Sequence, residues 1–210
     1  LSFTPPYPQT VQENSERIYS EILRLKNLSG THKPILLMGH SKGGAEVLLT
    51  VLHHPDLIAN GIIDRVIVMQ GPVGGTPLAD LLTRFKKVDP VSEWWWGSPF
   101  NVFRRWILNL GWLQGAESMS PEEIVPLINK GLSLLTPDSR TLLNAAIFFV
   151  TVAQEPNHPR YPESSKAIFN FGRQIYPTIE KFPPALKYPT FDSYMASFGP
   201  SDDLIPLASQ

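Results

Sequence analysis

The chain has 210 residues, of which 42% are hydrophobic and 18% are charged, and this composition predicts a globular fold of one domain, or of one domain with a large insertion. The 18 basic and 19 acidic residues leave a net charge of −1, so nothing in the charge favours a nucleic-acid partner. There is no cysteine, which excludes disulfides and thiolate metal sites. There is also no run of about 18 apolar residues, so we expect no membrane-spanning segment. These features do not decide the cellular compartment of the protein.

The first part of the chain has the element order of an α/β protein. Residues 11–28 carry apolar side chains at helical spacing, and residues 34–38 form a short apolar run typical of a buried strand. A helix is predicted over 42–53, and a second apolar run follows at 65–70. A strand, a helix and a strand in this order predict two parallel strands. The glycine-rich loop at 71–77 then lies at the carboxyl edge of the sheet, where open parallel sheets place their active sites.

The middle of the chain has no strand signal. Four segments are predicted as helices: 78–87, 101–110, 121–134 and 138–153. A helical run of roughly a hundred residues is longer than a crossover between parallel strands requires, so we predict an inserted cap. Strand character returns at 193–198. The predicted division is therefore a core over 1–77, a helical cap or lid over 78–186, and a last core strand with its following loop over 187–210.

The predicted cap is rich in large apolar side chains. They are Trp94, Trp95, Trp96, Phe100, Phe103, Trp106, Ile107, Trp112, Phe148 and Phe149. Most are expected to form the core of the cap itself. The three consecutive tryptophans cannot all face one way, so this part of the cap could contact a lipid surface.

The sequence Gly-His-Ser-Lys-Gly at 39–43 lies between the first strand and the helix that follows it. In this setting the pattern is typical of a nucleophile elbow, a sharp turn that exposes a serine hydroxyl above a sheet. The glycines allow a strained backbone and a close approach of the helix. The free N–H groups of the helix start favour the negative oxygen of a tetrahedral intermediate. The alternative is that Ser41 only caps the helix of another kind of α/β unit.

These residues resemble the α/β-hydrolase superfamily and, within it, the bacterial triacylglycerol lipases. Residues 39–44 match their Gly-His-Ser-x-Gly-Gly elbow, and residues 71–80 are similar to a Thr-Pro-x-x-Gly-Ser segment followed by Leu-Ala-Asp. Residues 135–139 are similar to a segment of their cap. Residues 202–206 resemble the Asp-Gly-Leu-Val-Pro turn that carries their catalytic acid, with Asp203 in the glycine position. The resemblance covers about four-fifths of the chain.

The resemblance implies a three-layer α/β-hydrolase sandwich with a parallel central sheet, of which this chain holds part, and a large helical cap. It implies Ser41 as the nucleophile, the backbone N–H of Lys42 as an oxyanion-hole donor, and Asp202 as the acid that orients a base histidine. Asp202 could instead only form a turn, and Asp203 is the next candidate for the acid. The chemistry needs no cofactor, and the sequence offers no cluster of carboxylates for the calcium ion that some such lipases carry.

The implied function is hydrolysis of a carboxylic ester with a lipid or other hydrophobic acyl group, through an acyl-enzyme. Acyl transfer or thioester hydrolysis would use the same site. A rival of another class is a non-catalytic module that binds a lipid or a protein partner, because a fold alone does not fix a function.

Two parts of the family's machinery do not match this sequence. The base histidine of the family follows the acid, whereas all five histidines here precede Asp202. Of these, His158 could reach the site by an unusual closure of the lid, and the others are expected to be structural or solvated. The early His-Gly strand that supplies a second oxyanion donor in the superfamily is also missing. We therefore expect a fragment of a longer protein with little turnover of its own.

Overall fold

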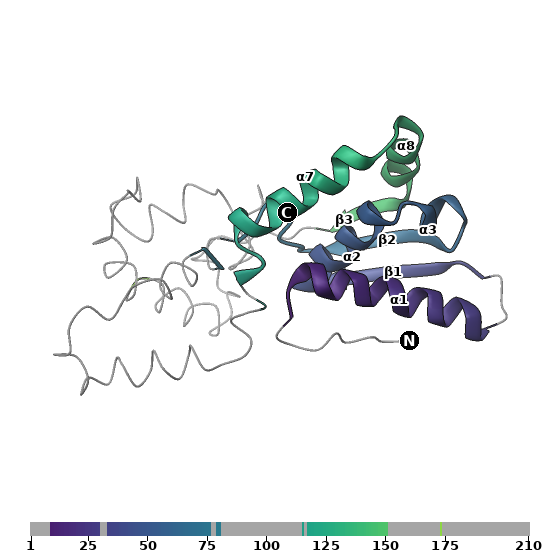
Figure 1. Cartoon of the computed structure of the whole chain (residues 1–210), viewed down its shortest axis with the longest axis horizontal. Coiled ribbons are helices and arrows are strands. Elements are labelled where there is room, and N and C mark those ends of the chain that lie inside the picture. The colour runs from purple at the N-terminus through teal and green to yellow at the C-terminus, as the bar shows by residue number, and fades with distance from the viewer. Residues whose placement is uncertain are drawn as a thin grey trace, which may run out of the picture.

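The computed structural model describes residues 9–29, 33–76, 79–80, 115, 117–150 and 173 (Figure 1). Its elements in chain order are α1 (Val11–Ser29), β1 (Ile35–His40), α2 (Lys42–His53), α3 (Asp56–Ala59), β2 (Ile63–Met69), α7 (Pro121–Leu134), α8 (Pro137–Ala146) and β3 (Ile147–Val150). None of the helices in this described part of the chain is long and apolar enough to cross a bilayer.

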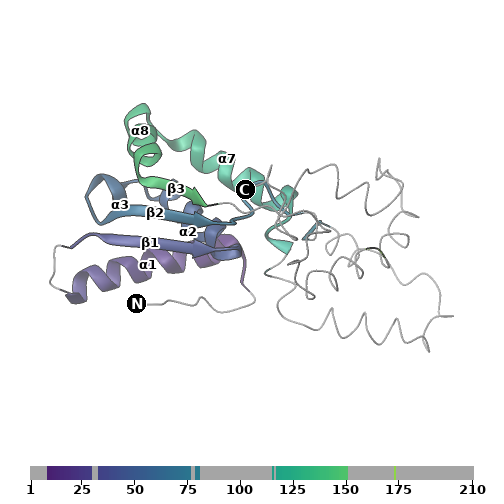
Figure 2. The same cartoon turned by 180° about the vertical axis from the view of Figure 1, so that it is seen from behind.

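The three strands form one parallel sheet in the order β1-β2-β3, which Figure 2 shows from behind. Leu37 pairs with Val66, and Val66 pairs in turn with Ile147, so these residues point to the same face of the sheet. Helices with a small parallel sheet make this an α/β fold, as the sequence predicts. The predicted helices 11–28 and 42–53 are α1 and α2, and the two predicted strands are β1 and β2.

The prediction of a helix over 138–153 is wrong at its carboxyl end. Helix α8 ends at Ala146, and Ile147, Phe148, Phe149 and Val150 form β3 against β2. β-branched and aromatic side chains fit a pleated strand, and the pairing with β2 outweighs the helical spacing. Phe148 and Phe149 therefore belong to the sheet and not to a helix of the cap, whose boundaries stay a prediction. The predicted helix 121–134 is confirmed as α7.

Local sequence explains where the helices begin. Thr10 and Glu13 form a capping box before α1, because Thr10 Oγ1 accepts from the Glu13 N–H at 3.1 Å and Glu13 Oε2 accepts from the Thr10 N–H at 2.9 Å. The bonds that the Glu13 carboxylate accepts from the Thr10 N–H and from the Thr10 hydroxyl lower the pKa of Glu13. Helix α8 begins after Thr136, whose hydroxyl accepts from the Ser139 N–H, and has Pro137 at its first position.

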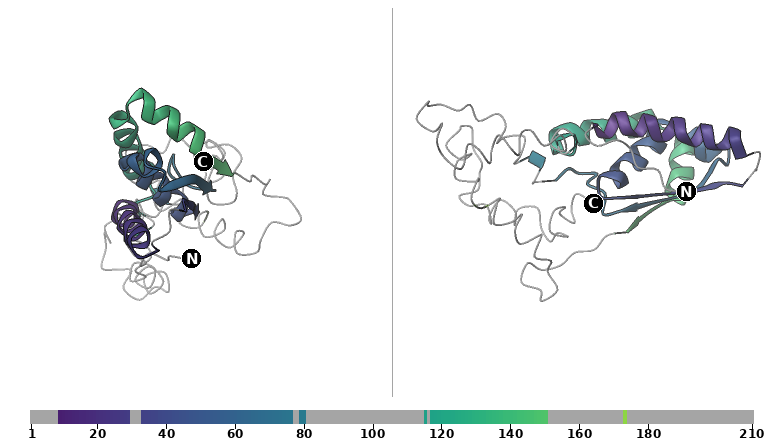
Figure 3. Two further views of the ribbon diagram at one scale, coloured as in Figure 1. Left: turned by 90° about the vertical axis from the view of Figure 1, so that its right-hand side faces the viewer. Right: turned by 90° about the horizontal axis from the view of Figure 1, so that it is seen from below.

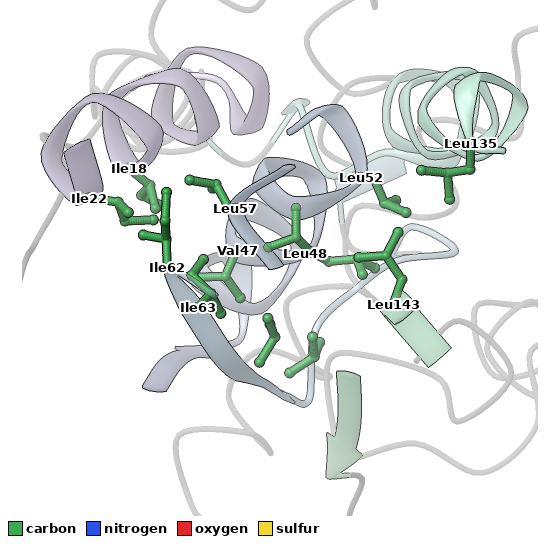
Figure 4. Close-up of a cluster of buried hydrophobic side chains, with 13 residues drawn as sticks. Ile18, Ile22, Val47, Leu48, Leu52, Leu57, Ile62, Ile63, Leu135 and Leu143 are labelled. Atoms are coloured by element: carbon green, nitrogen blue, oxygen red, sulfur yellow. The ribbon is translucent and has the colours of Figure 1, made fainter. Parts of the chain in front are cut away.

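The core lies between one face of the sheet and the helices, as the close-up in Figure 4 shows. It consists of side chains from α1, α2, α3, the central strand β2 with Ile62 just before it, and the α7–α8 region: Ile18, Ile22, Val47, Leu48, Val51, Leu52, Leu57, Ile62, Ile63, Val66, Val68, Leu135 and Leu143. Each such side chain contributes roughly 1.5–3 kcal/mol when it is fully buried. Four of these side chains, Val47, Leu48, Val51 and Leu52, belong to α2, the helix that follows Ser41.

The described helices lie on one side of the sheet (Figure 3, right view). On the opposite face the apolar side chains are open: Leu36 and Met38 of β1 are 57% and 55% exposed, and Phe148 and Val150 of β3 are 50% and 41% exposed. β1 is also one edge of the described sheet. The third layer of the expected sandwich is not among the described residues and stays a prediction.

Candidate active site

Ser41 occupies the turn between β1 and α2 with a strained backbone. Its φ of 53° and ψ of −126° lie in a region that residues with a side chain rarely adopt, at a cost of about 1–3 kcal/mol. The surroundings hold this turn, because the Ser41 N–H donates to the Met69 carbonyl at 2.9 Å and the Ser41 carbonyl accepts from the Gly44 N–H at 2.8 Å. The Ser41 side chain makes no capping hydrogen bond. Ser41 thus occupies the N-cap position of α2 without a capping bond from its hydroxyl, and its role as the nucleophile stays a prediction.

Glycines let α2 approach the strands closely at this turn. A Cβ on Gly39 would lie 2.1 Å from the Gly43 carbonyl oxygen, and a Cβ on Gly44 would lie 2.9 Å from the Gly71 Cα. Both contacts are with backbone, so neither neighbour can rotate away. The first turn of α2 is thus packed against the carboxyl ends of β1 and β2, as the glycine pattern of the motif predicts.

Gln70 is a second strained residue beside the elbow, and the sequence gives little signal for it. It follows β2 with a φ of 48°, and its N–H donates to the Val150 carbonyl at 2.9 Å. A hydrogen bond of 2.9 Å joins Gln70 Oε1 and His40 Nε2. The ring of His40 therefore bonds to Gln70 and not to the hydroxyl of Ser41, as expected for a residue adjacent to the serine.

Lys42, the first residue of α2, has a buried side chain in contact with buried polar groups. Its Nζ lies 3.4 Å from Glu46 Oε1 and donates to the Gln9 carbonyl, and the two side chains of this ion pair are only 10% and 4% exposed. The Asn14 side-chain amide donates to the same Glu46 oxygen at 2.7 Å. Burial raises the pKa of Glu46, while the Asn14 hydrogen bond and the Lys42 charge oppose this shift. The spacing of four residues between Lys42 and Glu46 is the only sequence signal for this pair.

The part of the chain that the structure describes contains none of the predicted candidates for the base and the acid. Asp202, Asp203 and His158 lie outside the described residues, as does the tryptophan-rich part of the predicted cap. His53 and His54 lie at the far end of α2, a helix of 12 residues and thus roughly 18 Å long. Among the described residues no group of three histidine, aspartate or glutamate side chains could share a metal ion.

His53 and His54 are part of the packing between α1, α2 and α7. The ring of His54 stacks on Tyr19 with centroids 3.6 Å apart, and its Nε2 lies 3.4 Å from Glu16 Oε2. The ring of His53 packs close to Gly131 of α7. Burial is the largest cause that lowers the pKa of His53.

We expect the chain to lose stability at mildly acidic pH because of His53. Since its pKa is lowered in the folded state, the unfolded chain binds the proton first as the pH falls below about 6.5, and the stability present at higher pH is lost. The free energy of unfolding is measured with urea at pH values of about 8 and about 5.5. The loss of free energy between the higher and the lower pH should be smaller for His53→Gln than for the parent. His54→Gln is the control, and an unchanged pH difference in His53→Gln would contradict the prediction.

Comparisons with known proteins give a similar fold. Neither a protein-family model nor a curated protein sequence matches the chain. Among solved structures, the lipase BlEst2 of Bacillus licheniformis in its mature form is similar with a TM-score of 0.57 and 15% sequence identity, over 96% of this chain and 61% of that chain. Its propeptide form gives a TM-score of 0.48 and 16% identity, over 77% and 30% of the two chains. The chain spans about three-fifths of the length of the mature lipase and has a lipase-like fold.

Proposed function

We propose that the protein is a serine hydrolase that cleaves carboxylic esters, with Ser41 as its nucleophile. The observation that carries the proposal is the strained backbone of Ser41, with φ 53° and ψ −126°, at a strand-to-helix turn. Strain of this kind persists only where the surroundings enforce it, and it is concentrated at functional sites. In this turn the hydroxyl makes no capping bond, so it is available for a substrate.

The proposed reaction proceeds through an acyl-enzyme. The Ser41 oxygen attacks the ester carbonyl carbon, a base histidine takes the hydroxyl proton, and the alcohol leaves with a proton returned by that histidine. Water then hydrolyses the acyl-enzyme by the same steps. The backbone N–H of Lys42 and the N-terminal end of α2 stabilise the negative oxygen of each tetrahedral intermediate. Asp202 is the proposed acid that orients the histidine, and Asp203 is the next candidate.

A lipid or another hydrophobic acyl ester is the proposed substrate. The similar structure of mature BlEst2 is that of a lipase, and this supports an ester of the same kind for this chain. In this proposal the three consecutive tryptophans at 94–96, within the predicted cap, contact the lipid surface. Acyl-chain length then becomes the property that separates a lipase from a general esterase.

The test uses the natural protein that contains this chain. Its hydrolysis of p-nitrophenyl esters with short and long acyl chains is measured, and the protein is treated with a fluorophosphonate that modifies only activated serines. We expect hydrolysis that favours long chains and an adduct on the peptide that contains Ser41. Urea-unfolded protein is the control and should not be labelled. An adduct confined to another serine, or no hydrolysis of any ester, would overturn the proposal.

A further inference from the structure

We propose that the buried groups around Lys42 fix the position of the backbone N–H groups at the elbow, and that Lys42, Glu46 and Asn14 are positioning residues for the reaction. We call these three side chains, with the Gln9 carbonyl, the Lys42 network. The inference rests on the proposed function, because it assigns a role to the residue that follows the nucleophile. It adds side chains to the described part of the site, which otherwise consists of backbone groups and the Ser41 hydroxyl.

The Lys42 network is unusual for its place in the fold. A lysine at the first position of a helix normally extends into solvent, and lysine is almost never buried unless it is paired. Here the Lys42 side chain is 10% exposed and its Nζ lies 3.4 Å from Glu46 Oε1, one helical turn further on. The ammonium group also donates to the carbonyl of Gln9, two residues before α1. The side chain of Lys42 is thereby held at its far end.

The network connects three segments that are distant in sequence. Asn14 of α1 donates to Glu46 Oε1 at 2.7 Å, so the carboxylate is held by both helices. Gly115 closes the third side, because a Cβ there would lie 2.9 Å from Lys42 Nζ. Lys42 carries both the anchored ammonium group and the backbone N–H next to Ser41. Holding its side chain at Nζ therefore restricts the orientation of the peptide group between Ser41 and Lys42. A shift of about 1 Å in such a donor is enough to reduce a rate about 100-fold.

A purely stabilising role explains the network less well. A buried ion pair gains little net stability, because the desolvation of both charges offsets their attraction. Helices α1 and α2 are already packed together in one apolar cluster, to which Ile18 and Ile22 of α1 and Val47 and Val51 of α2 belong. The ion pair lies instead at the end of α2 that begins at Ser41. The ion pair therefore restricts the backbone at the elbow more than it adds to the stability of the fold.

The test compares two variants of the natural protein that contains this chain. The double substitution Lys42→Met with Glu46→Gln removes both charges at nearly constant volume, and the new amide oxygen can still accept from Asn14. Thr50→Val is the matched control: it removes buried hydrogen bonds from the Thr50 hydroxyl to the Ser15 and Glu46 carbonyls, further along the same helix. The double variant removes the contact of Lys42 with Gln9, just before α1, and Thr50→Val removes a polar contact between α1 and α2. Only the double variant changes the start of α2.

Two measurements separate positioning from stability and from catalysis. The first is the rate at which the Gly44 N–H, which bonds to the Ser41 carbonyl, exchanges its hydrogen with solvent. This rate should rise at least about 10-fold in the double variant and should not change in Thr50→Val. The kcat for ester hydrolysis should fall about 10- to 100-fold in the double variant at constant KM, and not in the control.

Each outcome decides the inference. Unchanged Gly44 exchange in the double variant would overturn it, as would an equal increase in Thr50→Val. If the parent protein shows no ester hydrolysis that depends on Ser41, the proposed function fails, and the exchange of Gly44 still shows whether the network fixes the elbow.

Discussion

The Ser41→Ala variant of the natural protein is expected to hydrolyse esters at least about 1,000-fold more slowly than the parent, with an intact fold. Alanine has no oxygen to form the acyl-enzyme, so only the residual effect of substrate binding and oxyanion stabilisation remains. Replacing a capping serine with alanine usually costs about 1 kcal/mol of stability. Ser41 makes no capping hydrogen bond, so we expect almost no loss here.

The measurements are kcat/KM for a p-nitrophenyl ester and the temperature of thermal unfolding. Ser20→Ala is the control, because Ser20 is an exposed residue of α1 whose hydroxyl donates to the Glu16 carbonyl of its own helix. This control should keep its activity. If Ser41→Ala retained more than about a tenth of the parent rate, a role for Ser41 as the nucleophile would be untenable.

The elbow and its flanking elements could be predicted because their signals are local. An apolar run ending in Gly-His-Ser-Lys-Gly requires a strand, a turn and a helix within about 20 residues, and β1, Ser41 and α2 have this arrangement. Helix α7 was equally accessible, since Pro121 marks its first turn and its apolar residues recur at helical spacing. The residues of these segments are sufficient to predict their secondary structure.

The remaining features depend on contacts between distant parts of the chain. Residues 147–150 form a strand because β2 lies beside them, and a short apolar run alone does not separate a strand from a helix. Burial of Lys42 depends on Gln9, 33 residues earlier, and on Gly115. The bond between His40 and Gln70 joins residues 30 positions apart. The local pattern of the sequence does not specify such pairings, because they form only when the sheet and the helices are packed together.

The Gly39→Ala variant is expected to lose more than about 4 kcal/mol of its free energy of unfolding, which is most of the stability of a typical domain. The new Cβ would lie 2.1 Å from the Gly43 carbonyl oxygen, 2.5 Å from its carbonyl carbon and 2.8 Å from the Gly44 nitrogen. These atoms form the first turn of α2. That turn cannot retreat, because it is held by the bond from Ser41 to Met69 and by the core side chains of α2.

Gly43→Ala is the matched control, in the same motif and on the other side of Ser41. A Cβ on Gly43 would have no atom within 4 Å, and Gly43 lies within helix α2. Since alanine favours a helix over glycine by about 1 kcal/mol, this variant should be as stable as the parent or slightly more stable. Urea unfolding of both variants measures the difference. Equal destabilisation of the two would mean that the motif needs glycine for backbone freedom, whereas loss at Gly39 alone would mean that the elbow depends on the close approach of α2 to β1.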